Sequence, residues 1–195
     1  FPKDVYYLYQ SLFTNKNVLH VFPHWNWQPG QQVDIWAYYN NADEVELLLN
    51  GRSLGKKSKT GDKLHVQWRV TYEPGILIAI SRKNGKTVMQ REIHTAGAPY
   101  SIRLTPDRTR LRSNDDDLSF ITVEIIDKEG NIVPDAANLV QFAVKGPASI
   151  AGVDNGSQTS MESFKASQRS AFKGKCLVVI KAGNTKGAIT VTALA

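Results

Sequence analysis

Cysteine and long apolar runs are scarce in this sequence of 195 residues. The one cysteine, Cys176, leaves no internal disulfide, so packed cores have to hold the fold together. It lies in the apolar run CLVVI, which predicts a small buried hydrophobic side chain. No apolar run approaches the roughly 20 residues of a membrane-spanning helix, so we expect no insertion into a membrane.

Positive charge is in excess, but it is not concentrated. Lys and Arg number 24 against 18 Asp and Glu, which gives a net charge of +6. The densest basic cluster, Lys56, Lys57 and Lys59, adjoins a predicted turn. Nucleic-acid-binding domains gather basic residues into a patch or stripe, or carry a known motif, and this sequence has neither. We therefore expect no nucleic-acid partner.

The residue groupings of common catalytic and metal sites are also missing. The 4 histidines are dispersed without zinc-ligand spacing such as HExxH, and no GxSxG motif marks a serine nucleophile. The run Asp115–Asp117 predicts an exposed loop, with a calcium site as the alternative. Glu44 and Glu46 share the outward face of one predicted strand, where solvation is the default. We therefore predict no catalytic centre, no metal and no cofactor in this chain.

Short strands separated by turn signals fill the segment from Val18 to His94. QQVDIWAYY (31–39) sets Val33, Ile35, Ala37 and Tyr39 against Asp34, Trp36 and Tyr38, and LHVQWRVTY (64–72) places Leu64, Val66, Trp68, Val70 and Tyr72 on one face. Asn50-Gly51 and Asn84-Gly85 are strong two-residue hairpin turns. This spacing predicts an immunoglobulin-like β-sandwich over residues 17–96.

A second β-sandwich follows a short Ala-Gly-Ala-Pro linker at residues 96–99. YSIRLTP (100–106) restarts the strand pattern, and LSFITVEIID (118–127) alternates cleanly. Further apolar strands follow as far as the C-terminal residues. We therefore predict an all-β fold of two tandem immunoglobulin-like sandwiches, the second over residues 97–195, behind a short N-terminal helix.

That helix is predicted over FPKDVYYLYQSLF (1–13). Apolar and aromatic residues fall there at the three-and-four spacing of one helix face: Val5, Tyr6, Leu8, Tyr9, Leu12 and Phe13. Asp4 near the start suits the helix dipole. A lone aromatic-rich helix before an all-β chain needs a surface to cover. It either folds back on the first sandwich or is the last helix of a domain upstream of Phe1.

The segment PHWNWQPG (23–30) is the main candidate for a binding role. It places His24, Trp25, Asn26 and Trp27 directly before a Pro-Gly turn. Indole rings are large flat apolar faces with one hydrogen-bond donor, which suits them to sugars or to a neighbouring domain. Three interpretations are open: one indole fills the core while the other covers its rim, the loop docks a domain, or the loop contacts sugar.

Three stretches resemble the C-terminal region of glycoside hydrolase family 2, in particular β-galactosidase-like members from Bacteroidetes. Residues 1–13 resemble the closing helix of that family's (β/α)8 barrel. Residues 20–57, with HWNW and DEVELLLNG, resemble the start of the first sandwich after the barrel. GVDNG (152–156) and ESFKASQRSAFKGKCLVVIK (162–181) resemble the terminal immunoglobulin-like domain.

The resemblance implies roles for particular residues. Residues 1–16 correspond to the terminal helix of a missing catalytic barrel, with Tyr6, Tyr9 and Phe13 facing that barrel. The loop His24-Trp25-Asn26-Trp27 faces the barrel too, where it docks or lines the outer substrate pocket. No position corresponds to the family's catalytic glutamates, so hydrolase activity belongs to the parent and not to this chain.

Three functions follow from these expectations. The first is a non-catalytic accessory region that buttresses the barrel of a β-galactosidase-like enzyme, its partner within the same chain. The alternative is a carbohydrate-binding module, and a cell-surface spacer or adhesin ranks third, because β-sandwiches host many unrelated functions. The resemblance also implies a periplasmic or extracellular location for the parent.

Overall fold

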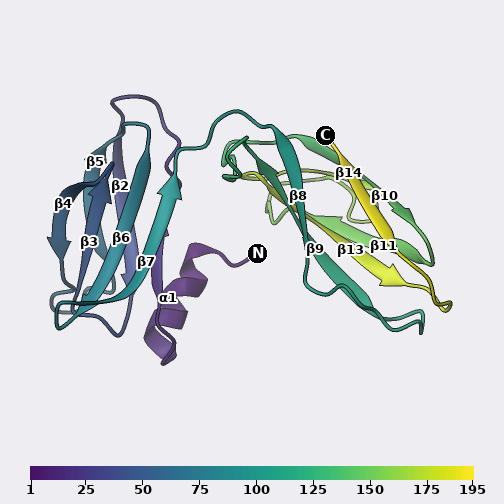
Figure 1. The fold of residues 1–195 in the computed structure, drawn as a ribbon, viewed down its shortest axis with the longest axis horizontal. Helices are drawn as coiled ribbons and strands as arrows, with labels where there is room; N and C mark the ends of the chain where they lie inside the picture. Colours follow the sequence, from purple (N-terminus) through teal and green to yellow (C-terminus); the bar gives the residue numbers. More distant parts are fainter. The chain divides into compact units, whose positions relative to one another are not determined.

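The computed structural model describes residues 1–195, which form two compact units, Phe1–Thr95 and Ala96–Ala195. Strands dominate and one helix precedes them, so the predicted all-β fold behind a short N-terminal helix is confirmed (Figure 1). Each unit has its own pair of sheets and its own hydrophobic core. The two units are called the first and second domains below.

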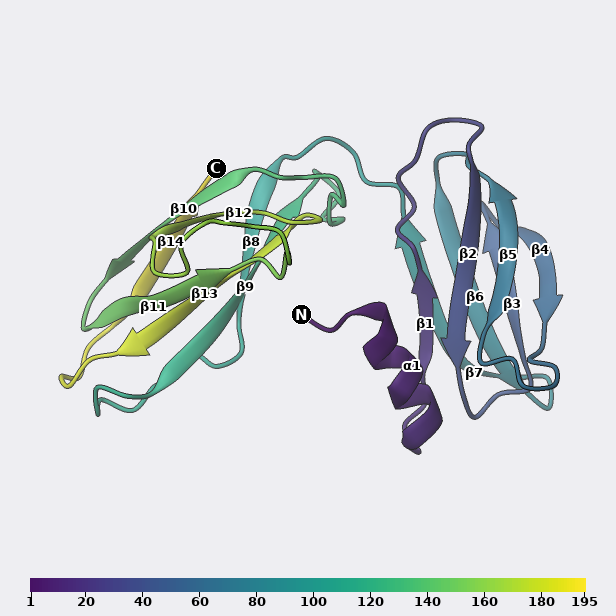
Figure 2. The ribbon, with the colours of Figure 1, turned by 180° about the vertical axis from the view of Figure 1, so that it is seen from behind.

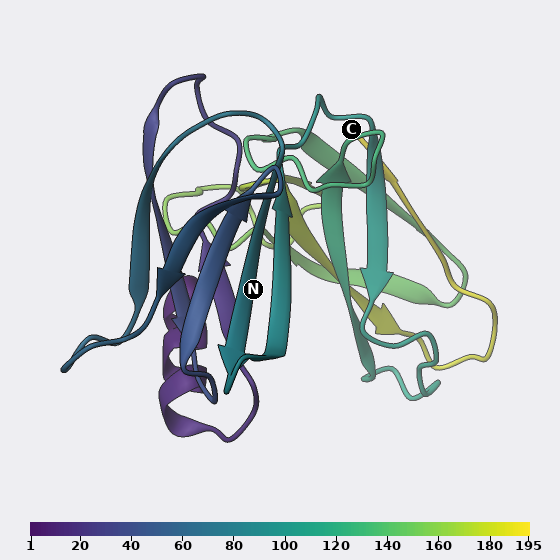
Figure 3. The ribbon, with the colours of Figure 1, turned by 60° about the vertical axis from the view of Figure 1, so that its left-hand side comes forward.

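The first domain consists of one helix and two antiparallel sheets, which can be followed in Figures 2 and 3. Its elements are α1 (Asp4–Phe13), β1 (Leu19–Phe22), β2 (Gln32–Tyr39), β3 (Glu44–Leu49), β4 (Arg52–Lys57), β5 (Val66–Thr71), β6 (Ile76–Lys83) and β7 (Lys86–His94). One sheet has the order β1-β2-β5 and the other β4-β3-β6-β7. Every pairing is antiparallel, as in a β-sandwich.

Alternation along the strands builds this core. Ile35 on β2, Leu47 on β3 and Trp68 on β5 point between the sheets and are almost fully buried. The prediction was wrong for Leu64, which is 44% exposed. Strand β5 begins only at Val66, so the alternation that Leu64 seemed to continue has no sheet beneath it.

The two Asn-Gly pairs make the predicted hairpin turns. Asn50 and Gly51 have φ values of 51° and 79°, and Asn84 and Gly85 have 50° and 74°. Positive φ at both central residues is the signature of a type I′ turn, whose twist matches that of the flanking strands. These turns fix the β3–β4 and β6–β7 hairpins and with them the register of the larger sheet.

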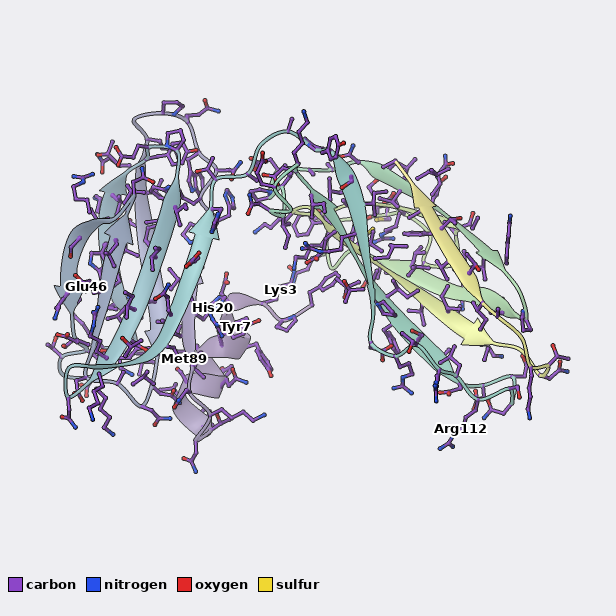
Figure 4. The ribbon with its side chains drawn as sticks, in the orientation of Figure 1. Lys3, Tyr7, His20, Glu46, Met89 and Arg112 are labelled. Atoms are coloured by element: carbon purple, nitrogen blue, oxygen red, sulfur yellow. The ribbon has the colours of Figure 1, made fainter.

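Helix α1 lies against β1 and β2 of the first domain. His20 Nε2 of β1 lies 2.8 Å from Asp4 Oδ1 in the first turn of the helix. The Tyr7 ring stacks on the His20 ring with centroids 3.9 Å apart, and the two labelled side chains lie together in Figure 4. One face of the helix therefore belongs to the first domain, as expected for a helix folded back on the sandwich.

The second domain is built from two further antiparallel sheets. Its strands are β8 (Ser101–Pro106), β9 (Leu118–Ile126), β10 (Leu139–Lys145), β11 (Ala148–Asp154), β12 (Gln168–Ser170), β13 (Lys175–Ala182) and β14 (Thr190–Leu194). The sheet orders are β11-β13-β9-β8 and β12-β10-β14. Val123 on β9 and Val178 on β13 form the centre of its core, and both are completely buried.

Cys176 lies in this core and is completely buried, as predicted. Burial raises the pKa of its thiol to about 12, with smaller contributions from Arg169 and Glu162. A thiol with this pKa is thiolate in only about one molecule in ten thousand at pH 8, and thiolate is the reactive form.

We therefore expect Cys176 to resist a thiol-disulfide exchange reagent at pH 8 while the chain is folded. The same chain in concentrated urea is the control, and it should react completely and fast. Equal rates in the folded and unfolded chains would contradict the burial of this thiol.

Candidate functional site

The loop at residues 23–30 connects β1 to β2 and carries the predicted HWNW site. Trp25 is completely buried in the first domain. Its indole Nε1 donates to the Glu73 carbonyl at 3.0 Å, and its ring meets the Tyr72 ring edge to face at 5.0 Å. The Thr95 hydroxyl donates to the Trp25 carbonyl at 2.9 Å. Trp25 therefore anchors the loop in the core.

Trp27 has a different position, although it is only two residues away. It is half-buried, and its ring stacks on His24 with centroids 4.7 Å apart. Its Nε1 donates to the His24 carbonyl at 2.8 Å, and the Asn26 amide donates to His24 Nδ1 at 3.2 Å. His24, Asn26 and Trp27 thus form a small rigid cap at the rim of the domain. The structure brings these three together and separates Trp25 from them.

A row of aromatic rings lies on the face of the β1-β2-β5 sheet opposite the core. This aromatic row consists of Tyr7, His20, Phe22, Trp36, Tyr38 and His65. Phe22 lies 4.9 Å from Tyr38 and 6.0 Å from Trp36. Trp36 stacks on His65 at 4.2 Å with nearly parallel rings. The sequence placed Trp36 and Tyr38 on the face opposite Val33 and Ile35, but Asp34 on the same face concealed that this face is aromatic.

The face of α1 that points away from the sheet is apolar and exposed to solvent. Five of its side chains are between 40% and 77% exposed: Val5, Tyr6, Tyr9, Leu12 and Phe13. Tyr9 and Phe13 stack on each other at 6.0 Å. Contiguous exposed apolar patches of this kind mark interaction surfaces in soluble proteins. We call these five residues the α1 face.

Two glutamates with lowered pKa values hold strands together. The Ser53 hydroxyl donates to Glu46 at 2.7 Å, and Arg82 lies 2.7 Å from the second oxygen of the same carboxylate. These contacts outweigh burial and lower the pKa of Glu46. Burial opposes ionisation of Glu124, but hydrogen bonds led by that from Lys175 outweigh it and lower the pKa. A general acid needs a raised pKa, so neither carboxyl is suited to donate a proton.

The acidic loop Asp115–Asp117 is organised by hydrogen bonds within the chain. Asp117 accepts the Arg112 amide at 2.9 Å, and Asn114 accepts the amides of Asp116 and Asp117. No group of three His, Cys, Asp or Glu side chains is placed to hold a metal ion. The ten-residue α1 is also far shorter than a membrane span, and no helix here meets that requirement.

Arg169 in the second domain is a feature that the sequence interpretation missed. Its side chain is completely buried, and it donates to the Glu162 carbonyl at 2.9 Å and to Asn155 Oδ1 at 3.1 Å. Asp154 Oδ1 lies 3.5 Å from Nη2, and the guanidinium covers the Phe164 ring at 5.1 Å. These contacts tie the loop at residues 155–167 to β12. The stretches GVDNG and ESFKASQRS contain every member of this network.

Comparison with known proteins places both domains. The sequence model described as "Glycoside hydrolase family 2 C-terminal domain 5" matches residues 102–195, and a domain of unknown function (DUF4982) matches residues 30–89. A β-galactosidase from Bacteroides ovatus, BoGH2A, is 59% identical over 193 residues, which cover 99% of this chain and 23% of that protein. The chain belongs to the C-terminal region of glycoside hydrolase family 2.

Two further similar proteins agree with this assignment. A putative β-glucuronidase from Formosa agariphila is 35% identical over 99% of this chain and 19% of its own length. The crystal structure of a β-glycosidase from Bacteroides vulgatus superposes with a TM-score of 0.93 at 37% identity, covering 99% of this chain and 25% of that one. This chain therefore spans less than a quarter of the length of these two curated family 2 relatives.

Proposed function

We propose that this chain is a non-catalytic accessory region that docks on the catalytic barrel of its parent glycoside hydrolase. The observation that carries the proposal is the α1 face. α1 covers β1 and β2 with one side and leaves five apolar side chains exposed on the other. Such a surface calls for a covering partner, and the relatives are four to five times longer than this chain.

The cap formed by His24, Asn26 and Trp27 is the second part of this proposal. Its three side chains are partly exposed, and the loop is held by hydrogen bonds from the Asn26 backbone amide to the His24 ring and from the Trp27 indole to the His24 carbonyl. We propose that the cap faces the barrel as well and shapes the outer edge of its substrate pocket. We propose that the parent hydrolyses O-glycosidic bonds, because its relatives are named as a β-galactosidase, a putative β-glucuronidase and a β-glycosidase, and that it is an exported enzyme.

Carbohydrate binding by the chain itself is the second candidate, and the aromatic row favours it. Sugar rings stack on flat aromatic faces, and Trp36 and Phe22 are only partly buried. Calorimetry of the 195-residue chain with galactosides separates the two functions. An accessory region should show no binding heat, whereas binding at millimolar affinity or tighter would favour a carbohydrate-binding module.

Docking through the α1 face is tested by substitution in the full-length enzyme. We expect the double variant Tyr9→Ser/Phe13→Ser to weaken the barrel–accessory interface by about 2–5 kcal/mol, because the exposed half of two aromatic rings is no longer buried there. The melting temperature of the enzyme should fall, and limited proteolysis should release the accessory region.

Two controls make this result specific to docking. In the 195-residue chain, the same double variant should have the same melting temperature as the unsubstituted chain, because both side chains are already largely exposed there. Tyr100→Ser replaces an aromatic residue of the second domain that is 66% exposed. It should change the free energy of unfolding of the full-length enzyme by less than about 0.5 kcal/mol. If the double variant leaves both stability and proteolysis of the enzyme unchanged, the α1 face is not a docking surface.

A further inference from the structure

The core of the second domain is open along one side. Strand β8 is the outer strand of one sheet and β14 is the outer strand of the other. A cavity of about 950 Å³ opens beside these two strands, and much of its lining comes from the loops at residues 107–117 and 183–189. Its apolar lining includes Leu104 on β8, Val191 on β14, and Ile121 and Ile180 on the central strands β9 and β13. We call this cavity the edge groove.

The edge groove is bordered by backbone that pairs with nothing. β8 pairs only with β9, and β14 pairs only with β10, so each strand keeps one row of free amide and carbonyl groups. Leu104 and Val191 are only partly buried, whereas Val123 and Val178 on the central strands are completely buried. The sandwich therefore has room for one more strand on this side.

The charged residues that line the edge groove are all basic, and we call them its basic rim: Arg108, Arg110, Arg112 and Lys186. Arg108 forms two ion pairs: its Nε lies 3.4 Å from Asp107 Oδ2, and its Nη1 lies 3.5 Å from Asp117 Oδ1. Arg110 and Lys186 are exposed and form no ion pair, whereas Arg112, on the loop after β8 in Figure 4, lies near Asp117 and helps to lower the pKa of that carboxyl. Negative charge on an occupant would complement Arg110 and Lys186.

We propose that the edge groove binds an extended acidic peptide segment of another polypeptide as an added strand beside β14. Strand addition satisfies free backbone groups and places alternate side chains in pockets. β14 contains no proline, whereas β8 ends in Pro106, so β14 is the better edge for pairing. Alternate apolar side chains of the segment lie over Ile121 and Ile180, and acidic side chains meet the basic rim.

The test uses the 195-residue chain and fluorescent synthetic peptides of about eight residues, a common strand length. A peptide of alternating valine and glutamate should bind with a micromolar Kd that weakens as salt is raised. Methylating the backbone nitrogens at one alternate set of positions should abolish binding, and methylating the other set should be tolerated. This difference is the signature of strand pairing, because alternate amides point to opposite sides of a strand.

Charge reversal on the rim tests the second half of the proposal. Arg110→Glu/Lys186→Glu should weaken binding of the valine–glutamate peptide by about tenfold or more. Lys63→Glu/Lys83→Glu makes the same change in charge at exposed positions of the first domain, and it should alter the affinity by less than about twofold. Circular dichroism of both variants confirms that each remains folded.

Four outcomes would overturn the proposal. The first is that no valine–glutamate peptide binds at millimolar concentration, and the second is that a valine–lysine peptide binds as well. The third is that both sets of backbone methylation are tolerated, which excludes strand addition. The fourth is that decanoate binds in the groove while the peptides do not, which makes the groove a site for an anionic amphiphile.

Discussion

Replacing Arg169 by alanine is expected to destabilise the second domain by about 3–5 kcal/mol, the range for removal of one partner from a buried charged network. The guanidinium is completely buried and donates to Glu162 and Asn155. Without it, the Glu162 carbonyl and the Asn155 side chain lose their donor, and a cavity opens beside Phe164. The loop at residues 155–167 loses its tie to β12.

The chain offers a convenient measurement for this variant. All 4 tryptophans lie in the first domain, so tryptophan fluorescence follows that domain alone while far-ultraviolet circular dichroism follows both. In urea, the circular dichroism transition of Arg169→Ala should move to lower concentration, while the fluorescence transition stays in place. Arg110→Ala removes an exposed, unpaired arginine and should leave both transitions unchanged. If Arg169→Ala behaves like Arg110→Ala, the buried network does not stabilise the domain.

Trp25→Ala is expected to destabilise the first domain by about 3–5 kcal/mol, as is usual for the loss of a fully buried tryptophan. The substitution removes the contact with Tyr72 and the hydrogen bond to the Glu73 carbonyl. It also frees the loop at residues 23–30 from the core. Fluorescence of the remaining tryptophans and circular dichroism should both show the first domain unfolding at lower urea concentration.

Trp27→Ala is the matched control, since the residue type is the same and the position differs by two. Trp27 is half-buried, stacks on the His24 ring and only borders the core, so we expect a smaller loss of about 1–2 kcal/mol. If the cap faces the barrel, Trp27→Ala should instead change the stability or the kinetics of the full-length enzyme. Equal destabilisation by the two substitutions would contradict the separate positions of the two indoles.

These two indoles show how much of the candidate site could be predicted from the sequence. PHWNWQPG predicted a binding loop, and one of its interpretations placed one tryptophan in the core and the other on the rim. Nothing in the local sequence says which is which, because both are flanked by polar residues. The choice depends on Tyr72 and Glu73, which directly follow β5, more than forty residues along the chain.

The strands were predictable because their information is local. Alternation with a period of two marks a half-buried strand wherever it occurs, and Asn-Gly pairs supply the positive φ that type I′ turns need. Leu64 shows the limit of the method. Alternation extends to it, but a strand lasts only as long as a neighbour pairs with it, and pairing of β5 with β2 begins at Val66 and Ala37.

Three features could not be predicted from the sequence: the burial of Arg169, the aromatic row and the edge groove. An arginine in QRS is read as exposed unless the folded loop at residues 155–167 is known to surround it. The aromatic row joins α1, β1, β2 and the residue before β5, and only strand order brings those segments side by side. The edge groove is formed where the outer strands β8 and β14 meet the loops at residues 107–117 and 183–189, which are distant in the sequence.

The sequence by itself determined the all-β fold, the hairpin turns, the burial of Cys176 and the resemblance to family 2 glycoside hydrolases. Each of these depends on residues close together in the chain or on motifs matched in order. The tertiary structure decided which tryptophan anchors the core, which face of α1 stays exposed and which strand edges stay free. Those features depend on contacts between distant segments, and local patterns of hydrophobicity do not encode their pairing.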